Sequence, residues 1–84
     1  MTSEDRIIRG KNADQLLSNP LMDDAFTSIE AEIVNDWKQS SGLPSEDREA
    51  MFLKLSVLSE VKAKLESFIT DGKISQNRLN MKTL

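Results

Sequence analysis

The chain has 84 residues with 14 acidic and 11 basic side chains, a net charge of −3, and neither cysteine nor histidine. The missing residue types exclude disulfides, thiolate chemistry and the usual zinc or copper ligands. A chain of this length forms one small domain, residues 1–84, which buries about 60–65% of its unfolded surface. A second subunit is therefore an expected supplement to the small core.

A short helix is predicted over residues 4–18. Its apolar face is formed by Ala13, Leu16 and Leu17, extended by Ile7 and Ile8. Gly10 falls inside this segment, where its poor helix propensity weakens the pattern. The N-terminal stretch "MTSEDRIIRGKNADQ" is charged throughout, which is not typical of a signal peptide or a membrane anchor.

A long second helix is predicted from Pro20 to about Ser40. Asn19 is a preferred N-cap residue, and proline suits the first helical position. Asp23 and Asp24 follow in the first turn, where the helix dipole favours negative charge. The apolar residues that come next recur at the spacing of one helical face. They are Met22, Phe26, Ile29, Ile33 and Trp37.

A third helix is predicted from about Ser45 to Thr70, with Asp71 and Gly72 as its stop. Its apolar stripe consists of Met51, Leu55, Leu58, Val61, Leu65 and Phe68. The loop between the two long helices has about five residues, and loops this short usually join antiparallel neighbours. The pattern therefore predicts an αα-hairpin with Trp37 near the loop, opposite Met51 or Phe52.

The predicted fold class is all-α. Two long helices form the antiparallel hairpin, a short helix precedes it, and a short helix or tail follows it. The core spans about residues 12–72, and a basic C-terminal tail spans residues 73–84. Lys73, Arg78 and Lys82 give this tail its charge, since it contains no acidic residue.

No residue pattern predicts a catalytic site, a cofactor site or a metal site. Asp23 and Asp24 are the most conspicuous acidic pair, but adjacent helical side chains point about 100° apart. They do not converge on one substrate atom, as general acid–base catalysis requires. The sequence also lacks the Asp and Asn spacing of an EF-hand and a glycine-rich phosphate loop. The chain is predicted not to be an enzyme.

An excess of apolar residues on the third helix predicts a protein contact. One antiparallel partner and a short helix cover about half of its circumference, which leaves large side chains without an intramolecular partner. The predicted interface residues are Trp37, Phe52, Leu53, Val57 and Ile74. Trp37 is also read as a core residue that closes one end of the hairpin.

Two small basic clusters are candidates for contact with nucleic acid or an acidic partner. They comprise Arg6, Arg9 and Lys11 near the N-terminus and Lys73, Arg78 and Lys82 near the C-terminus. Solubility and interaction with the helix dipole explain the same charges. No aromatic residue is interleaved for base stacking, so nucleic-acid binding is possible but not favoured.

Several short motifs resemble a group of small bacteriophage proteins encoded among head and packaging genes. The resemblance covers about residues 9–75. It rests on Arg9-Gly10, Ala13, Leu16-Leu17, Asn19-Pro20, Ala25-Phe26, Trp37, Arg48-Glu49 and Gly72-Lys73. It implies a role in the phage virion or its assembly and assigns no catalytic residue.

The functional hypothesis is therefore a non-enzymatic phage assembly protein that acts through protein–protein contacts at the head, portal or connector. Its expected partners are a phage structural or assembly protein and further copies of itself. A DNA-packaging protein similar to the phage small terminase is the alternative, and a small anti-host inhibitor is a further one. No apolar run reaches the ~18 residues of a membrane span. The expected location is the host cytoplasm or the virion.

Overall fold

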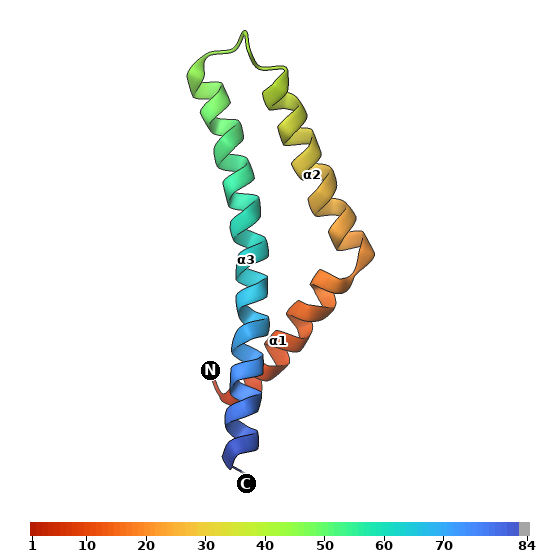
Figure 1. Cartoon of the computed structure of the whole chain (residues 1–84), viewed down its shortest axis with the longest axis vertical. Coiled ribbons are helices and arrows are strands. Elements are labelled where there is room, and N and C mark those ends of the chain that lie inside the picture. The colour runs from red at the N-terminus through yellow and green to blue at the C-terminus, as the bar shows by residue number, and fades with distance from the viewer. Residues whose placement is uncertain (83–84) are drawn as a thin grey trace.

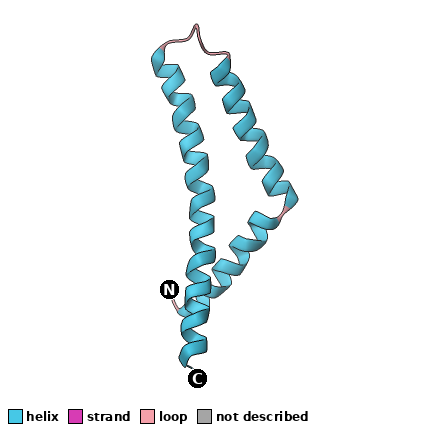
Figure 2. Cartoon of the chain, viewed as in Figure 1, coloured by secondary structure: helices cyan, strands magenta, loops and turns pink. Residues whose placement is uncertain are grey.

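The computed structural model describes residues 1–82 and contains three helices within them. Helix α1 spans Ser3–Ser18, α2 spans Pro20–Lys38 and α3 spans Ser45–Lys82. The described residues include no strand, so the predicted all-α class is confirmed (Figures 1 and 2).

Helix α1 begins at a capping box formed by Thr2 and Asp5. The Thr2 hydroxyl accepts a hydrogen bond from the Asp5 N–H at 3.0 Å, and the Asp5 carboxylate accepts one from the Thr2 N–H at 3.2 Å. Two N–H groups that would lack a helical partner are satisfied in this way. The hydrogen bond from the Thr2 backbone is the main reason why the pKa of Asp5 is lowered.

Asn19 is the single residue between α1 and α2. Its N–H donates to the Leu16 carbonyl at 3.2 Å, and its Oδ1 accepts from the Leu21 N–H at 2.9 Å. Its backbone is extended, with φ −74° and ψ 121°, which changes the direction of the chain before Pro20 starts α2. The predicted N-cap is confirmed, and the two helices join at an angle (Figure 1).

Replacing Asn19 by alanine should lower the free energy of unfolding by about 1 kcal/mol, because the cap of α2 loses its acceptor. Asn77→Ala is the matched control, since Asn77 is exposed inside α3 and alanine is the better helix former. Chemical denaturation followed by circular dichroism measures both changes. Equal effects in the two variants would show that Asn19 does not act as a cap.

Helix α3 continues through Asp71 and Gly72, so the predicted stop at these residues is wrong. The segment predicted as a separate short helix or basic tail is the last part of one 38-residue helix, and residues 83–84 lie outside the described residues. A glycine inside a helix costs about 0.5–1 kcal/mol relative to alanine. Here the lost propensity is offset by packing, because Gly72 is buried against α1.

The tightest packing in the structure is the crossing of α1 and α3 at Gly10 and Gly72. A Cβ atom built on Gly10 would lie 2.8 Å from the Phe68 carbonyl oxygen and 3.1 Å from Gly72 Cα. Ala13 and Ser75, one helical turn further along, are 3% and 2% exposed. Small residues on both helices therefore let the two backbones touch. Gly10 and Ser75 fall just outside the predicted core of 12–72.

Gly10→Ala should destabilise the protein by about 1–3 kcal/mol, because the added methyl group would overlap backbone atoms of α3 and force the two helices to shift apart. Gly42→Ala is the control, since a Cβ atom there meets nothing within 4 Å. Thermal unfolding by circular dichroism distinguishes the two. The close crossing is contradicted if Gly10→Ala is as stable as the wild type.

Helices α2 and α3 run in opposite directions and lie together at the loop end (Figure 1), but the predicted packed hairpin is not confirmed. Among the apolar residues predicted to fill it, Phe26 is buried at 8% exposure, whereas Ile29 and Val61 are 43% and 47% exposed. Phe68, also predicted in this core, packs against α1 instead, where the Arg9 guanidinium lies 4.0 Å from its ring centroid.

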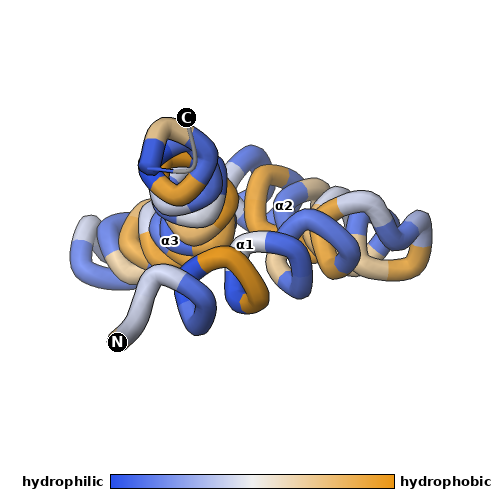
Figure 3. The backbone as a smooth tube through the Cα atoms, turned by 90° about the horizontal axis from the view of Figure 1, so that it is seen from below, coloured by the Kyte–Doolittle hydropathy of each residue, from blue (hydrophilic) through white to orange (hydrophobic). Residues whose placement is uncertain are grey.

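The molecule is long and open. Its extents are 64 × 25 × 16 Å, and its radius of gyration is 18.1 Å, against about 12 Å for a compact domain of this length. Figure 3 looks along the long axis and shows α1 across α3, with α2 extending to one side. The core is thus concentrated at the α1–α3 crossing, and the α2–α3 half of the molecule is open.

Candidate interaction surface

An apolar groove lies between α2 and α3. It has a volume of about 560 Å³. Its walls are Ile29 and Ile33 from α2 and Ala50, Leu53, Lys54, Val57, Leu58 and Val61 from α3. Lys54 is the one charged side chain among them. We call these eight residues the α2–α3 groove.

The groove is open because α1 acts as a spacer. After the crossing at Gly10, α1 continues to Ser18, which moves the chain about 12 Å along the α1 axis at 1.5 Å per residue. The Asn19 junction is therefore carried away from α3, and α2 approaches α3 again toward the loop of residues 39–44 (Figure 1). The apolar side chains of α2 and α3, whose spacing predicts a closed hairpin, therefore remain partly exposed.

Trp37 and Phe52 hold the loop end of the groove together. Their ring centroids are 6.3 Å apart at an interplanar angle of 80°, an edge-to-face contact. The Arg48 guanidinium lies 5.7 Å from the centroid of the Trp37 ring, and Ser40, which is fully buried, donates its hydroxyl to the Trp37 carbonyl. The predicted position of Trp37 opposite Phe52 is confirmed.

The five predicted interface residues are all exposed, but the structure does not bring all of them together. Leu53 and Val57 line the groove at 61% and 57% exposure. Phe52 and Trp37, at 54% and 38%, lie beside its loop end. Ile74 is 45% exposed on α3 beyond the glycine crossing, away from the groove.

Sequence reasoning missed six of the eight groove residues, Ala50 and Lys54 among them. Ile29, Ile33, Leu58 and Val61 line the groove, although their helical spacing predicts a closed core. The periodicity identifies an apolar face correctly, but it does not say whether the neighbouring helix lies close enough to cover that face.

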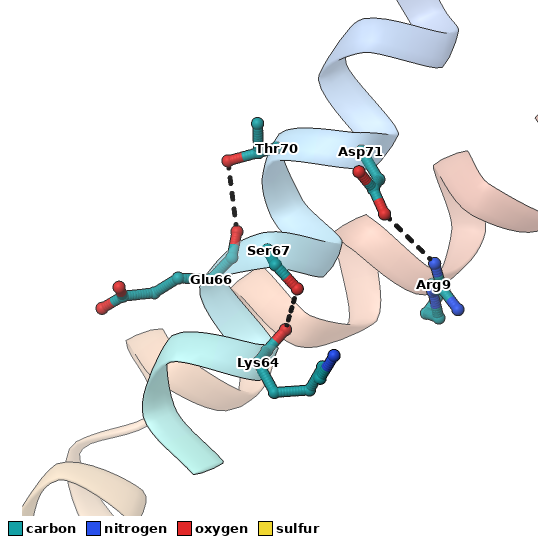
Figure 4. A network of polar contacts seen from close by, with 6 residues as sticks. All are labelled: Arg9, Lys64, Glu66, Ser67, Thr70 and Asp71. Carbon is teal, nitrogen blue, oxygen red and sulfur yellow. Dashed lines mark hydrogen bonds and ion pairs between the residues drawn. The ribbon is translucent and has the colours of Figure 1, made fainter. Parts of the chain in front are cut away.

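Arg9, predicted as a contact for nucleic acid or an acidic partner, is engaged within the chain. Its guanidinium lies over the Phe68 ring and donates to the Asp71 carboxylate at 3.5 Å. Figure 4 shows Arg9 and Asp71 pointing toward each other across the crossing, with Ser67 and Thr70 bonded to carbonyls of their own helix. Arg9 therefore helps to hold α1 on α3.

Arg9→Ala should cost about 1 kcal/mol of stability, because the stacked guanidinium and its alkyl stem are both lost. Asp71→Asn should cost less than about 0.5 kcal/mol, since the ion pair is exposed to solvent and screened by it. Denaturant titration of both variants ranks the two contacts. An equal loss in the two variants would mean that the ion pair, rather than the stacking, carries the contact.

The remaining basic residues do not form one patch. Lys11 and Lys73 share a hollow of about 230 Å³ at the α1–α3 crossing, where Asp14 also lies. The Arg6 side chain is half-buried near the start of α1. Arg78 and Lys82 are exposed on the last turns of α3. The basic side chains are therefore scattered over the surface, and they do not form the continuous basic patch that is typical of a DNA-binding protein.

Within residues 1–82, no cluster of three or more acidic side chains is arranged to hold a metal ion. None of the helices in that range combines the length and apolarity that crossing a membrane requires. Comparison of the chain with protein-family models, with curated proteins and with solved structures finds no match. The α2–α3 groove, with the exposed side chains of Leu53 and Val57 in its wall, is the strongest candidate site in the described part of the chain.

Proposed function

We propose that the protein is a non-enzymatic assembly protein that binds other proteins through the α2–α3 groove. The observation that carries this proposal is the open apolar groove itself, with Leu53 and Val57 at 61% and 57% exposure in its wall. Burying a large apolar side chain contributes roughly 1.5–3 kcal/mol. A helix laid into the groove covers several such residues at once, which is a common mode of helical recognition.

The proposed setting is the assembly of a bacteriophage particle, with a head, portal or connector protein as the partner. The motifs around Asn19-Pro20, Trp37 and Gly72-Lys73, which resemble small phage proteins of the head and packaging region, support this setting. The proposed location is accordingly the host cytoplasm during assembly or the virion. DNA packaging is the weaker alternative, because the basic side chains do not form one patch.

The proposal predicts that Leu53→Ser lowers the amount of this chain in particles of the phage that encodes it by at least about tenfold, since a lost anchor of about 1.4 kcal/mol changes binding tenfold. Leu21→Ser is the control, because Leu21 is 75% exposed on α2 and does not line the groove. Quantitative mass spectrometry of purified particles measures both variants.

Circular dichroism of each variant checks that the fold is retained. The assembly role would be contradicted if the wild-type chain is absent from particles and the Leu53→Ser variant still gives a normal yield of particles. Salt-dependent binding of the purified protein to DNA would instead favour the packaging alternative.

A further inference from the structure

The surface area of the chain exceeds that of a compact monomer. The exposed surface is 6469 Å² for a mass of 9.5 kDa, whereas a globular protein of that mass exposes about 5,050 Å². The excess of about 1,400 Å² is larger than the roughly 800 Å² that each partner contributes to a stable interface. The chain thus has enough uncovered surface for one full interface.

We propose that a second copy of this chain fills the α2–α3 groove, so that two hairpins pack face to face as a four-helix dimer. The inference deepens the assembly role proposed above and names the first partner of the same groove. The groove provides the core of such an interface, since seven of its eight lining residues are apolar. Trp37 and Phe52 extend this apolar surface to the loop end.

The charges of the two helices favour a second copy as the occupant. Helix α2 carries five acids and one base, a net −4, from Asp23, Asp24, Glu30, Glu32, Asp36 and Lys38. The groove-lining residues of α3 lie between Ala50 and Val61, where Lys54 and Glu60 balance, and the next turn adds Lys62 and Lys64, so that residues 50–64 carry a net +2. The acidic helix of one copy therefore complements the basic segment of another.

This complementarity selects one of the two ways in which the hairpins can stack. A two-fold axis along the helices places α2 of each copy over α3 of the other, with both loops at the same end. An axis across the helices places α2 over α2, where like charges repel. The dimer therefore has its axis along the helices and brings the acidic and basic helices together twice.

The pairing within one chain gives the register between copies. Trp37 lies against Phe52, and Phe26 lies under Lys62, whose Nζ is 5.6 Å from the ring centroid. In the dimer with its axis along the helices, the same register places Asp36 of one copy level with residues 52–53 of the other, within one helical turn of Lys54. Lys54 lines the groove, and Asp36 lies seven residues after Ile29, on the same side of α2.

A charge-reversal pair tests this arrangement with the full chain. Lys54→Glu alone places two carboxylates together at both contacts, and Asp36→Lys alone places two ammonium groups together. Each single variant should therefore raise the dimer dissociation constant by about tenfold or more. Mixing the two variants makes both contacts complementary again and should restore the dimer. Contacts inside one chain are unchanged by mixing, so only pairing between chains gives this rescue.

Size-exclusion chromatography with multi-angle light scattering over a concentration series measures the result. The proposal is supported if the wild type has twice the monomer mass, each charge variant alone dimerises more weakly, and the mixture of the two dimerises like the wild type. Leu53→Ser should also lose the dimer, whereas Leu21→Ser should keep it. Circular dichroism confirms that every variant is helical. A wild type that stays monomeric, a dimer that Leu53→Ser leaves intact, or a mixture that fails to recover overturns the proposal.

The two proposals fail in different ways. A monomeric chain that still enters particles through Leu53 removes the dimer and leaves the assembly role in place. A dimer that behaves as described, but never enters particles and does not affect their formation, removes the assembly role and leaves the dimer in place.

Discussion

Backbone contact between Gly10 and Gly72 fixes the angle at which α1 crosses α3, and the remaining geometry depends on that crossing. The space between the helices is too small for a methyl group at Gly10, where a Cβ atom would approach the Phe68 carbonyl oxygen to 2.8 Å. Ala13 and Ser75 continue the contact by one turn, and Arg9 covers its edge by stacking on Phe68. The crossing offsets the poor helix propensity of both glycines and lets α3 run as one helix to Lys82.

The open groove is a consequence of the crossing. Helix α1 leaves α3 at an angle, and the extended backbone at Asn19 then turns the chain into α2, which returns toward the loop end. Phe26 and the Trp37–Phe52 contact hold α2 to α3 at two points, and the apolar residues between these points stay half-buried or exposed. Among the described residues, α2 and α3 form the walls of the groove and α1 packs at the crossing, so none of these three helices covers the exposed side chains.

A small protein with a short core and a long apolar groove gains stability when a partner covers the groove. Binding and folding are then linked, because the partner binds the folded form in which α2 and α3 lie side by side. Asp36 on α2 and Lys54 in the groove wall would give the proposed association a preferred orientation. These features support the proposed role in assembly.

The local physics of the chain determined where α1 and α2 lie, where α3 begins, the cap of α2 and the apolar faces of the helices. Asn19 and Pro20 mark the start of α2 because a side-chain acceptor and a fixed φ suit that position wherever it lies in the fold. Leu53 and Val57 were identified as surplus apolar residues, since one helix cannot cover the whole circumference of another. These inferences need only spacing and residue chemistry, which the sequence contains.

Tertiary structure decided which apolar faces are closed and what the glycines do. Gly72 reads as a helix stop from sequence, because its propensity is poor, and it becomes a helix-packing residue once α1 lies against it. Ile29 and Val61 read as core residues, yet they line an open groove because the spacing between α2 and α3 is set by α1, on the other side of the Asn19 junction. Periodicity reports the side of a helix on which a residue lies, and only the distance to the next helix decides whether that side is buried.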